Sequence, residues 1–209
     1  MNIENTVRVV KLGGSLLELP DLIDRFDRLL DAWGDERLVL VVGGGTVADW
    51  VRQFDAANDI GPTQAHWLAV RAMQLNSHLI ASKLPRCRMV VDHEACQTAW
   101  REHSIPLVEP LGWLEAEHTR GIAIPHRWSF TSDSVAAHIA QRLGAVRLTL
   151  LKSTVPNTCS DPLQAATDGI VDKDFPTASE GIAAIDLINL RSDPPHQCRL
   201  RTNAHGQHR

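Results

Sequence analysis

The chain has 209 residues, of which 44% are hydrophobic and 22% are charged, as is ordinary for a soluble globular protein. Its formal net charge of −4 argues against a general nucleic-acid-binding protein, which needs a basic face. No apolar run is long enough to span a membrane, and the first residues lack the basic and apolar regions of a signal peptide, so we expect a cytoplasmic protein without a membrane partner. The four cysteines are scattered and form no CxxC pair, which favours reduced thiols over a disulfide framework or a zinc site.

The first motif is VRVVKLGGSLL, residues 7–17. Its β-branched residues predict a buried strand, which is followed by a glycine turn and the start of a helix. Gly13 and Gly14 permit positive φ and a close approach of the backbone to a ligand. Ser15 can cap the helix, whose N-terminus suits a phosphate, and Lys11 adds a cation at the same place. The motif therefore predicts a phosphate site.

The same unit occurs a second time shortly afterwards. Residues 21–33 carry apolar side chains at helical spacing, and residues 38–42, LVLVV, predict a strand that ends at Gly43, Gly44 and Gly45. A further helix opens at Thr46. Two strand–glycine–helix units predict an α/β fold with a mainly parallel central sheet.

The remaining elements follow in chain order. We expect helices at 63–84, 96–102, 111–117 and 134–143, with Thr63 capping the first, and strands at 87–91, 105–108, 121–124 and 146–152. Residues 153–180 are rich in Pro, Thr, Asp and Ser, which predicts loops. Residues 182–190 suit a strand or a short helix, 198–202 a last strand, and 203–209 a frayed tail, so that 1–202 form a single domain.

Several polar residues follow predicted strands or begin predicted helices. In parallel sheets the carboxyl ends of the strands meet at one edge, where ligands bind. Lys11, the two glycine turns, Asp133 and Lys152 all fall at such positions. Lysines, an aspartate and backbone N–H groups suit phosphoryl transfer, which needs positioning and charge neutralisation more than covalent chemistry. A strand-end lysine can also be merely solvated, and Asp133 can simply cap the helix that follows it.

These glycine turns match neither a Walker loop nor a GxGxxG fingerprint. Instead KLGGS after a strand, GGG after a second strand and TSDSVAAHIA at a later helix resemble the amino acid kinase superfamily, which includes aspartate, acetylglutamate and uridylate kinases. The resemblance covers residues 7–152 and implies a three-layer αβα sandwich that binds ATP and an acceptor across the strand ends. It implies that Lys11 holds the transferring phosphate, that Asp133 orients the catalytic lysines, and that the second lysine is Lys152 or Lys173.

The resemblance also implies binding roles for the residues around these three. ATP would contact Gly13, Gly14, Ser15, Lys152 and Lys173, and the acceptor would contact Gly43, Gly44, Gly45 and Ser132, although Ser132 can equally be a helix cap. Mg²⁺ would bridge the ATP phosphates with few protein ligands of its own, so no residue is predicted as a metal ligand. Members of the superfamily commonly form homo-oligomers, which we therefore expect here.

Two stretches resemble a smaller group within the superfamily, the archaeal-type aminomethylfuran phosphate kinases of methanofuran biosynthesis: AHWLAVRAMQLNSHLIA (65–81) and IPHRWSFTSDSVAAHIA (124–140). The implied acceptor is [5-(aminomethyl)furan-3-yl]methyl phosphate, which becomes a diphosphate. A phosphate monoester is already ionised and requires no general base. His66, Arg71 and Arg127 are available to bind it, and Trp67 and Trp128 can stack on its ring. Alternatively, both tryptophans belong to the core and His66 is an ordinary residue at the start of a helix.

Other functions fit the same residues less well. A small carboxylate or a nucleoside monophosphate is an alternative acceptor. A protein of another class, a non-catalytic nucleotide- or anion-binding sensor or storage protein, would not need to retain Lys11 and Asp133 together with both glycine turns. A histidine-based metalloenzyme is disfavoured because the histidines show no HxH or HxxxH spacing.

Overall fold

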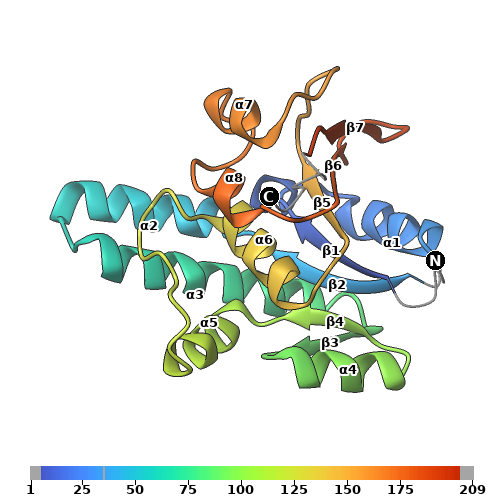
Figure 1. Ribbon diagram of the computed structural model, residues 1–209, viewed down its shortest axis with the longest axis horizontal. Helices are drawn as coiled ribbons and strands as arrows, with labels where there is room; N and C mark the ends of the chain where they lie inside the picture. Colours follow the sequence, from blue (N-terminus) through green and yellow to red (C-terminus); the bar gives the residue numbers. More distant parts are fainter. Residues whose placement is uncertain (1–5, 35, 203–209) are drawn as a thin grey trace, which may run out of the picture.

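The computed structural model describes residues 6–34 and 36–202, and these form one seven-stranded sheet (Figure 1). The strands are β1 (Val7–Leu12), β2 (Arg37–Val42), β3 (Cys87–Val90), β4 (Ile105–Val108), β5 (Arg147–Lys152), β6 (Ala184–Asn189) and β7 (His196–Leu200). Their order in the sheet is β3-β4-β2-β1-β5-β6-β7, and every neighbouring pair is parallel except β6 and β7. The predicted α/β fold with a mainly parallel sheet is confirmed.

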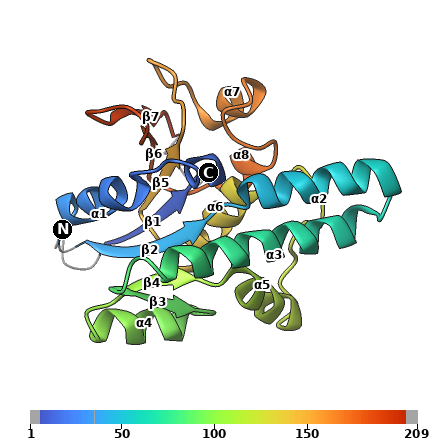
Figure 2. The same cartoon turned by 180° about the vertical axis from the view of Figure 1, so that it is seen from behind.

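Helices cover both faces of the sheet. They are α1 (Leu22–Ala32), α2 (Gly45–Asn58), α3 (Pro62–Ala81), α4 (His93–Arg101), α5 (Pro110–Thr119), α6 (Ser132–Arg142), α7 (Pro162–Thr167) and α8 (Phe175–Ala178). In Figures 1 and 2, α1 lies on one face of the sheet, while α4 and α6 lie on the other. The molecule is therefore the three-layer αβα sandwich that the sequence predicts.

The core has two layers because side chains alternate across each strand. Val10 and Leu12 of β1 pack with Phe26 of α1, whereas Val9 packs with side chains of α6 such as Ile139. Strands buried on both faces read as continuous apolar runs, which is why LVLVV was recognisable from the sequence. This burial holds the carboxyl ends of β1, β2 and β5 at one edge of the sheet.

An antiparallel pair of helices, α2 and α3, extends beyond that edge (Figures 1 and 2). The pair begins at the second glycine turn, where the Asn76 side-chain amide in α3 donates to the Gly43 carbonyl at 2.8 Å. Val51 on α2 is buried, while Trp50 and Phe54 on the same helix are exposed. The pair thus forms a wall beside the strand ends.

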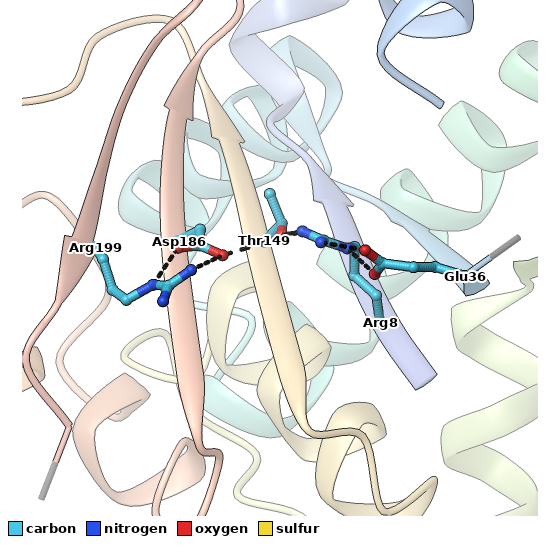
Figure 3. Close-up of polar contacts among 5 residues, drawn as sticks. All are labelled: Arg8, Glu36, Thr149, Asp186 and Arg199. Atoms are coloured by element: carbon cyan, nitrogen blue, oxygen red, sulfur yellow. Dashed lines mark hydrogen bonds and ion pairs between the residues drawn. The ribbon is translucent and has the colours of Figure 1, made fainter. Parts of the chain in front are cut away.

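A buried network of charged side chains joins strands at the sheet face next to α1 (Figure 3). The guanidinium of Arg8 donates two hydrogen bonds to Glu36, at 2.7 and 2.8 Å, and one to the Thr149 hydroxyl at 2.9 Å. It also lies 4.0 Å from the Asp186 carboxylate, which pairs with Arg199 at 2.7 Å. Arg8 is the second residue of β1, whereas Lys11 lies near the end of that strand. The network therefore holds the strands together away from the site at their carboxyl ends.

Four local predictions are wrong. The first glycine turn leads only into a three-residue 3₁₀ helix (Gly14–Leu16), and α1 begins after Pro20, so Ser15 caps no α-helix. The helix α3 begins at Pro62 after Gly61, which leaves Thr63 inside its first turn. Residues 121–124 form no strand in the described part of the chain, since Ile124 is buried by packing rather than by pairing. The region 153–180 contains α7 and α8, not loops alone.

The expected reduced state of all four cysteines is also wrong, because Cys159 and Cys198 form a disulfide with their Cα atoms 5.6 Å apart. The pairing depends on β7 folding back against β6, which brings Cys198 to the segment that follows β5. Sequence spacing alone carries no sign of that contact. Cys87 and Cys96 are free thiols.

The polar tail that was expected to fray, 203–209, lies outside the described residues. Residues 182–190, for which a strand and a helix were both open, contain strand β6. None of the helices within 6–34 and 36–202 combines the length and the hydrophobicity that a membrane span requires.

Candidate active site

One buried carboxylate joins two lysines at the carboxyl edge of the sheet. Lys11 lies near the end of β1 and Lys152 ends the neighbouring parallel strand β5, while Asp133 lies in the first turn of α6. The Lys11 Nζ is 2.9 Å from Asp133 Oδ1, and the Lys152 Nζ is 2.6 Å from Asp133 Oδ2. Lys11 and Asp133 are only 4% and 5% exposed. The structure thus brings together three residues that are far apart in the sequence.

The three charges depend on one another. Burial by itself would raise the pKa of Asp133, but the positive charges of Lys11 and Lys152 and their hydrogen bonds lower it to about 2. Burial lowers the pKa of Lys11, and the charge of Asp133 opposes that shift. Two lysines share one carboxylate, so the cluster itself carries excess positive charge and suits an anion such as a phosphate.

A second aspartate, Asp172, caps the start of α6, so the Asp133 carboxylate is not needed as the cap and can pair with the two lysines. Its carboxylate accepts hydrogen bonds at the start of α6 from the Thr131 backbone N–H (3.2 Å) and hydroxyl (2.7 Å), and from the Ser134 backbone N–H (3.0 Å) and hydroxyl. Burial, together with the charge of Asp133, raises the pKa of Asp172, although its bonds with Ser134 oppose the rise. Asp172 therefore caps α6 from a distant segment. Sequence reasoning missed it, because only Lys173 drew attention to this stretch.

The two glycine turns touch each other beside the lysines. The Gly13 N–H donates to the Leu151 carbonyl and the Gly43 N–H donates to the Leu12 carbonyl, both at 2.9 Å. A Cβ on Gly14 would lie 2.1 Å from the backbone nitrogen of Gly45, a distance that no side chain tolerates.

Among the five turn glycines only Gly45 has positive φ, +52°. Gly13 and Gly14 therefore do not use the positive φ that glycine permits. Close approach of two backbones is the property that these glycines provide.

A pocket of about 210 Å³ opens from the glycine turns toward α2 and α3, and we call it the α2–α3 pocket. Its other wall is the segment 127–132 that leads into α6. Seven residues predicted as binding residues line it: Gly14, Ser15, Gly44, Gly45, His66, Trp128 and Ser132. Gly43 belongs to the same turn as Gly44 and Gly45, and its carbonyl accepts the hydrogen bond from Asn76. The structure therefore gathers most of the proposed acceptor residues around one cavity.

Two predicted site residues lie elsewhere. The Arg71 guanidinium is more than half exposed, 4.0 Å from Glu115, and does not line the pocket. Lys173 is exposed and makes no hydrogen bond or ion pair with the described residues. Of the two candidates for the second lysine, the structure brings Lys152 to Asp133 and leaves Lys173 apart.

Sequence reasoning did not weigh Arg52, which lines the pocket, nor the carboxylates that hold Trp128 and Arg127 in place. The Trp128 indole N–H donates to Asp55 at 2.6 Å, and the Arg52 guanidinium lies 5.0 Å from the centre of the Trp128 ring. Arg127 donates two hydrogen bonds to Asp174, at 2.8 and 2.6 Å. These contacts tie the segment before α6 to α2 on one side and to the start of α8 on the other. They join residues of different elements, and no local pattern signals them.

Groups of three or more His, Cys, Asp or Glu side chains that could hold a metal ion are absent from residues 6–34 and 36–202. The buried carboxylate at the strand ends, Asp133, is already paired with two lysines. The cluster therefore suits the phosphates of a metal–nucleotide complex better than a bare metal ion.

Comparisons with known proteins agree with this geometry. A model of the amino acid kinase family matches residues 6–156. The chain is 26% identical over 183 residues to the [5-(aminomethyl)furan-3-yl]methyl phosphate kinase of Methanocaldococcus jannaschii, an alignment that covers 88% of this chain and 74% of that protein.

Solved structures share the fold. The UMP kinase of Ureaplasma parvum has a TM-score of 0.66 at 12% identity, covering 94% of this chain and 99% of that chain. The aspartate kinase of Synechocystis has a TM-score of 0.68 at 15% identity, covering 97% of this chain and 41% of that chain. The uridylate kinase of Archaeoglobus fulgidus has a TM-score of 0.60 at 18% identity, covering 93% and 91%. At these identities the likeness concerns the fold alone.

Proposed function

Because the chain belongs to the amino acid kinase family, we propose that it transfers the γ-phosphoryl group of ATP to a small phosphorylated acceptor. The chain is a kinase, and the proposal concerns its donor, its acceptor and the residues that serve them. The observation that carries it is the lysine–aspartate–lysine cluster beside the two touching glycine turns.

Each residue of the cluster has a part in this proposal. Lys11 and Lys152 bind the transferring phosphate and stabilise the charge that spreads over its oxygens. Asp133 holds both ammonium groups in place and remains ionised, since its pKa of about 2 leaves no proton for it to exchange at neutral pH. Backbone N–H groups of the glycine turns add donors that a side chain at Gly14 or Gly45 would block. ATP supplies the phosphoryl group, and Mg²⁺ neutralises its phosphates.

The proposed acceptor is [5-(aminomethyl)furan-3-yl]methyl phosphate, which would place the chain in methanofuran biosynthesis. The relative from Methanocaldococcus jannaschii supports it, and so does the size of the pocket. At about 210 Å³ it is smaller than the roughly 300–1,000 Å³ of pockets for drug-sized ligands, so it suits one small ring better than a nucleoside. Trp128 and Phe130 offer flat apolar surfaces to such a ring.

The test is an ADP-release assay with purified protein, ATP and Mg²⁺, in which this acceptor is compared with UMP, aspartate and acetylglutamate. We expect turnover with the furan-methyl phosphate and a new pair of coupled ³¹P resonances from its diphosphate. Turnover with UMP or with a carboxylate instead would show that the proposed acceptor is wrong, while the assignment as a kinase would stand. A protein that binds ATP and consumes none with any of the four would support the non-catalytic sensor or storage protein.

We also propose that residues 1–202 act as one catalytic domain in the cytoplasm and that the chain forms a homo-oligomer. Exposed apolar side chains support the oligomer: Val47, Trp50 and Phe54 follow one face of α2, and Leu75 and Leu79 follow one face of α3. Light scattering coupled to size exclusion should give a mass above that of one chain. The variant Trp50→Glu should lower that mass, and an unchanged monomer mass in both proteins would contradict the proposal.

A further inference from the structure

His66 is a buried side chain whose Nε2 atom has no hydrogen-bond partner among the described residues. It lies in the first half of α3, lines the α2–α3 pocket, and is 3% exposed. Its Nε2 atom is buried and makes no hydrogen bond within the described part of the chain. Buried polar atoms in folded proteins nearly always have a partner, so this atom, on a residue that lines the pocket, is available to a ligand or a water; the Nε2 of the stacked His126 is likewise buried without a hydrogen bond among the described residues.

Aromatic rings surround the imidazole. It stacks on His126 with the ring centres 5.2 Å apart and the planes 23° apart, and it contacts Trp67 at 5.5 Å and Phe130 at 6.3 Å. No hydrogen bond or ion pair links it to a carboxylate in the described residues. Burial, and then the charge of His126, lowers the pKa of His66 to about 4, so the ring is neutral at neutral pH.

The charged side chains that line the pocket are already paired. Asp49 and Arg52 on α2 form an ion pair at 2.5 Å, and Arg127 on the segment before α6 is held by Asp174. The wall at His66 therefore offers an uncharged hydrogen-bonding group among flat apolar rings. The glycine turns line the same pocket, and a Cβ on Gly13 would lie 3.7 Å from the Cα of Lys152, so the lysines lie beside them.

We infer that His66 determines which acceptor ring the pocket accepts: its imidazole hydrogen-bonds a polar group at the far end of a ring-bearing phosphate monoester, and that group must not be an anion. This inference rests on the proposed function, since it names the substrate class of the same pocket. A neutral imidazole can donate to a ring or hydroxyl oxygen, and its other nitrogen can accept from a hydroxyl or an ammonium N–H. It cannot neutralise a carboxylate, which would lose its hydration in the pocket without gaining a counter-charge.

The experiment uses two acceptors that share the furan-methyl phosphate and differ at the far substituent, hydroxymethyl in one and carboxyl in the other. Isothermal titration calorimetry measures the affinity of each for the whole protein, so it does not depend on turnover. We expect the unmodified protein to bind the hydroxymethyl compound at least about tenfold more tightly than the carboxyl compound. Equal affinities, or a preference for the carboxyl compound, would overturn the inference.

Variants separate a hydrogen bond from a packing effect. His66→Leu fills the same wall without a polar atom and should weaken binding of the hydroxymethyl compound about tenfold, while His66→Gln, which keeps a donor and an acceptor, should restore most of it. In turnover assays the loss should appear in KM, with kcat nearly unchanged. His118→Leu is the matched control, because His118 belongs to the same ring cluster, 5.6 Å from His126, but is exposed and does not line the pocket.

The outcomes distinguish this inference from the proposed function. If the hydroxymethyl compound is phosphorylated and His66→Leu leaves both affinities unchanged, the kinase assignment stands and the role of His66 is wrong. If neither compound is phosphorylated while the calorimetric preference is present and is lost in His66→Leu, the role of His66 in binding stands and the proposed reaction is wrong. If His66→Leu weakens binding of the hydroxymethyl compound and His66→Gln does not restore it, the effect comes from packing alone and the proposed hydrogen bond is refuted.

Discussion

Two lysines that share one carboxylate define the chemistry at the scale of single residues. Lys11 and Lys152 come from neighbouring strands and are separated by Asp133, so each ammonium group is positioned by the same side chain. Preorganised charge of this kind lowers the barrier of phosphoryl transfer because no group has to reorient as negative charge develops.

Replacing Lys11 by alanine tests this arrangement most directly. We expect kcat to fall by roughly 10³-fold, the loss typical of one removed donor at a developing charge. The fold should persist, because Asp133 keeps its bond with Lys152 at 2.6 Å. Steady-state kinetics and a thermal melt together measure both effects. Lys173→Ala is the matched control, since that lysine is exposed, and activity lost equally in both variants would contradict the assignment.

The low pKa of Asp133 predicts how the stability of the fold depends on pH. Its pKa in the folded chain is about 2, below the ordinary value of an aspartate near 4, so ionised Asp133 stabilises the fold above that ordinary value. The contribution should be lost as the pH falls from about 4 to about 2. In Asp133→Asn the contribution is absent at every pH. The difference in melting temperature between the two proteins should therefore be largest at neutral pH and shrink across that acid range, and a constant difference would contradict the pKa.

At the scale of elements, the site depends on two turns whose backbones touch. Gly14→Ala would place a methyl group 2.1 Å from the Gly45 nitrogen and force the turns apart. Since displacements of about 1 Å at a transfer site cost on the order of 100-fold in rate, we expect kcat to fall by that order. Gly144→Ala is a suitable control, because Gly144 has a φ of +62°, open space around it and no contact with the site. It should cost about 1 kcal/mol in stability and leave kcat unchanged.

The charged network around Arg8, at the other end of the strands, should affect stability rather than catalysis. Arg8→Leu would leave Glu36 and Asp186 without their buried partner, and we expect the free energy of unfolding to fall by about 3 kcal/mol. The rate of phosphoryl transfer should change little, because Arg8 lies at the start of β1. Urea denaturation and an activity assay check the two parts.

An exposed arginine provides the comparison for Arg8. Arg88 pairs with Glu102, and both side chains are about half exposed, so Arg88→Leu should cost less than about 1 kcal/mol. Equal losses of unfolding free energy in the two variants would mean that burial does not increase the contribution of the Arg8 network to stability.

At the scale of the whole molecule, the disulfide ties the segment after β5 to the last strand of the sheet. Cys159 and Cys198 are 39 residues apart, and closing a loop of that length restricts the unfolded chain by an amount worth up to about 4 kcal/mol. A reductant should therefore lower the melting temperature of the unmodified protein. The double variant Cys159→Ser with Cys198→Ser should melt at the lower temperature with or without the reductant. A reductant-induced shift of equal size in both proteins would show that another thiol is responsible.

The central part of the fold could be predicted from the amino-acid sequence alone. Val9, Val10 and the run from Leu38 to Val42 predicted buried strands because their apolar β-branched pattern is local and needs no partner to be recognised. The glycines that follow marked where the chain meets a ligand or another backbone. The order of these motifs predicted the family and the sheet edge at which Lys11 lies, and the comparisons confirm the family.

Which side chains meet at that edge could not be predicted from the sequence and depends on the folded structure. Lys152 rather than Lys173 reaches Asp133, because the parallel register of β1 and β5 brings the end of β5 beside Lys11. Asp172, not a neighbour in sequence, caps α6, and Arg71 faces away from the pocket. Partners of this kind are distant along the chain and leave no periodic pattern. Their meeting depends on sheet register and helix rotation, which packing sets for the molecule as a whole.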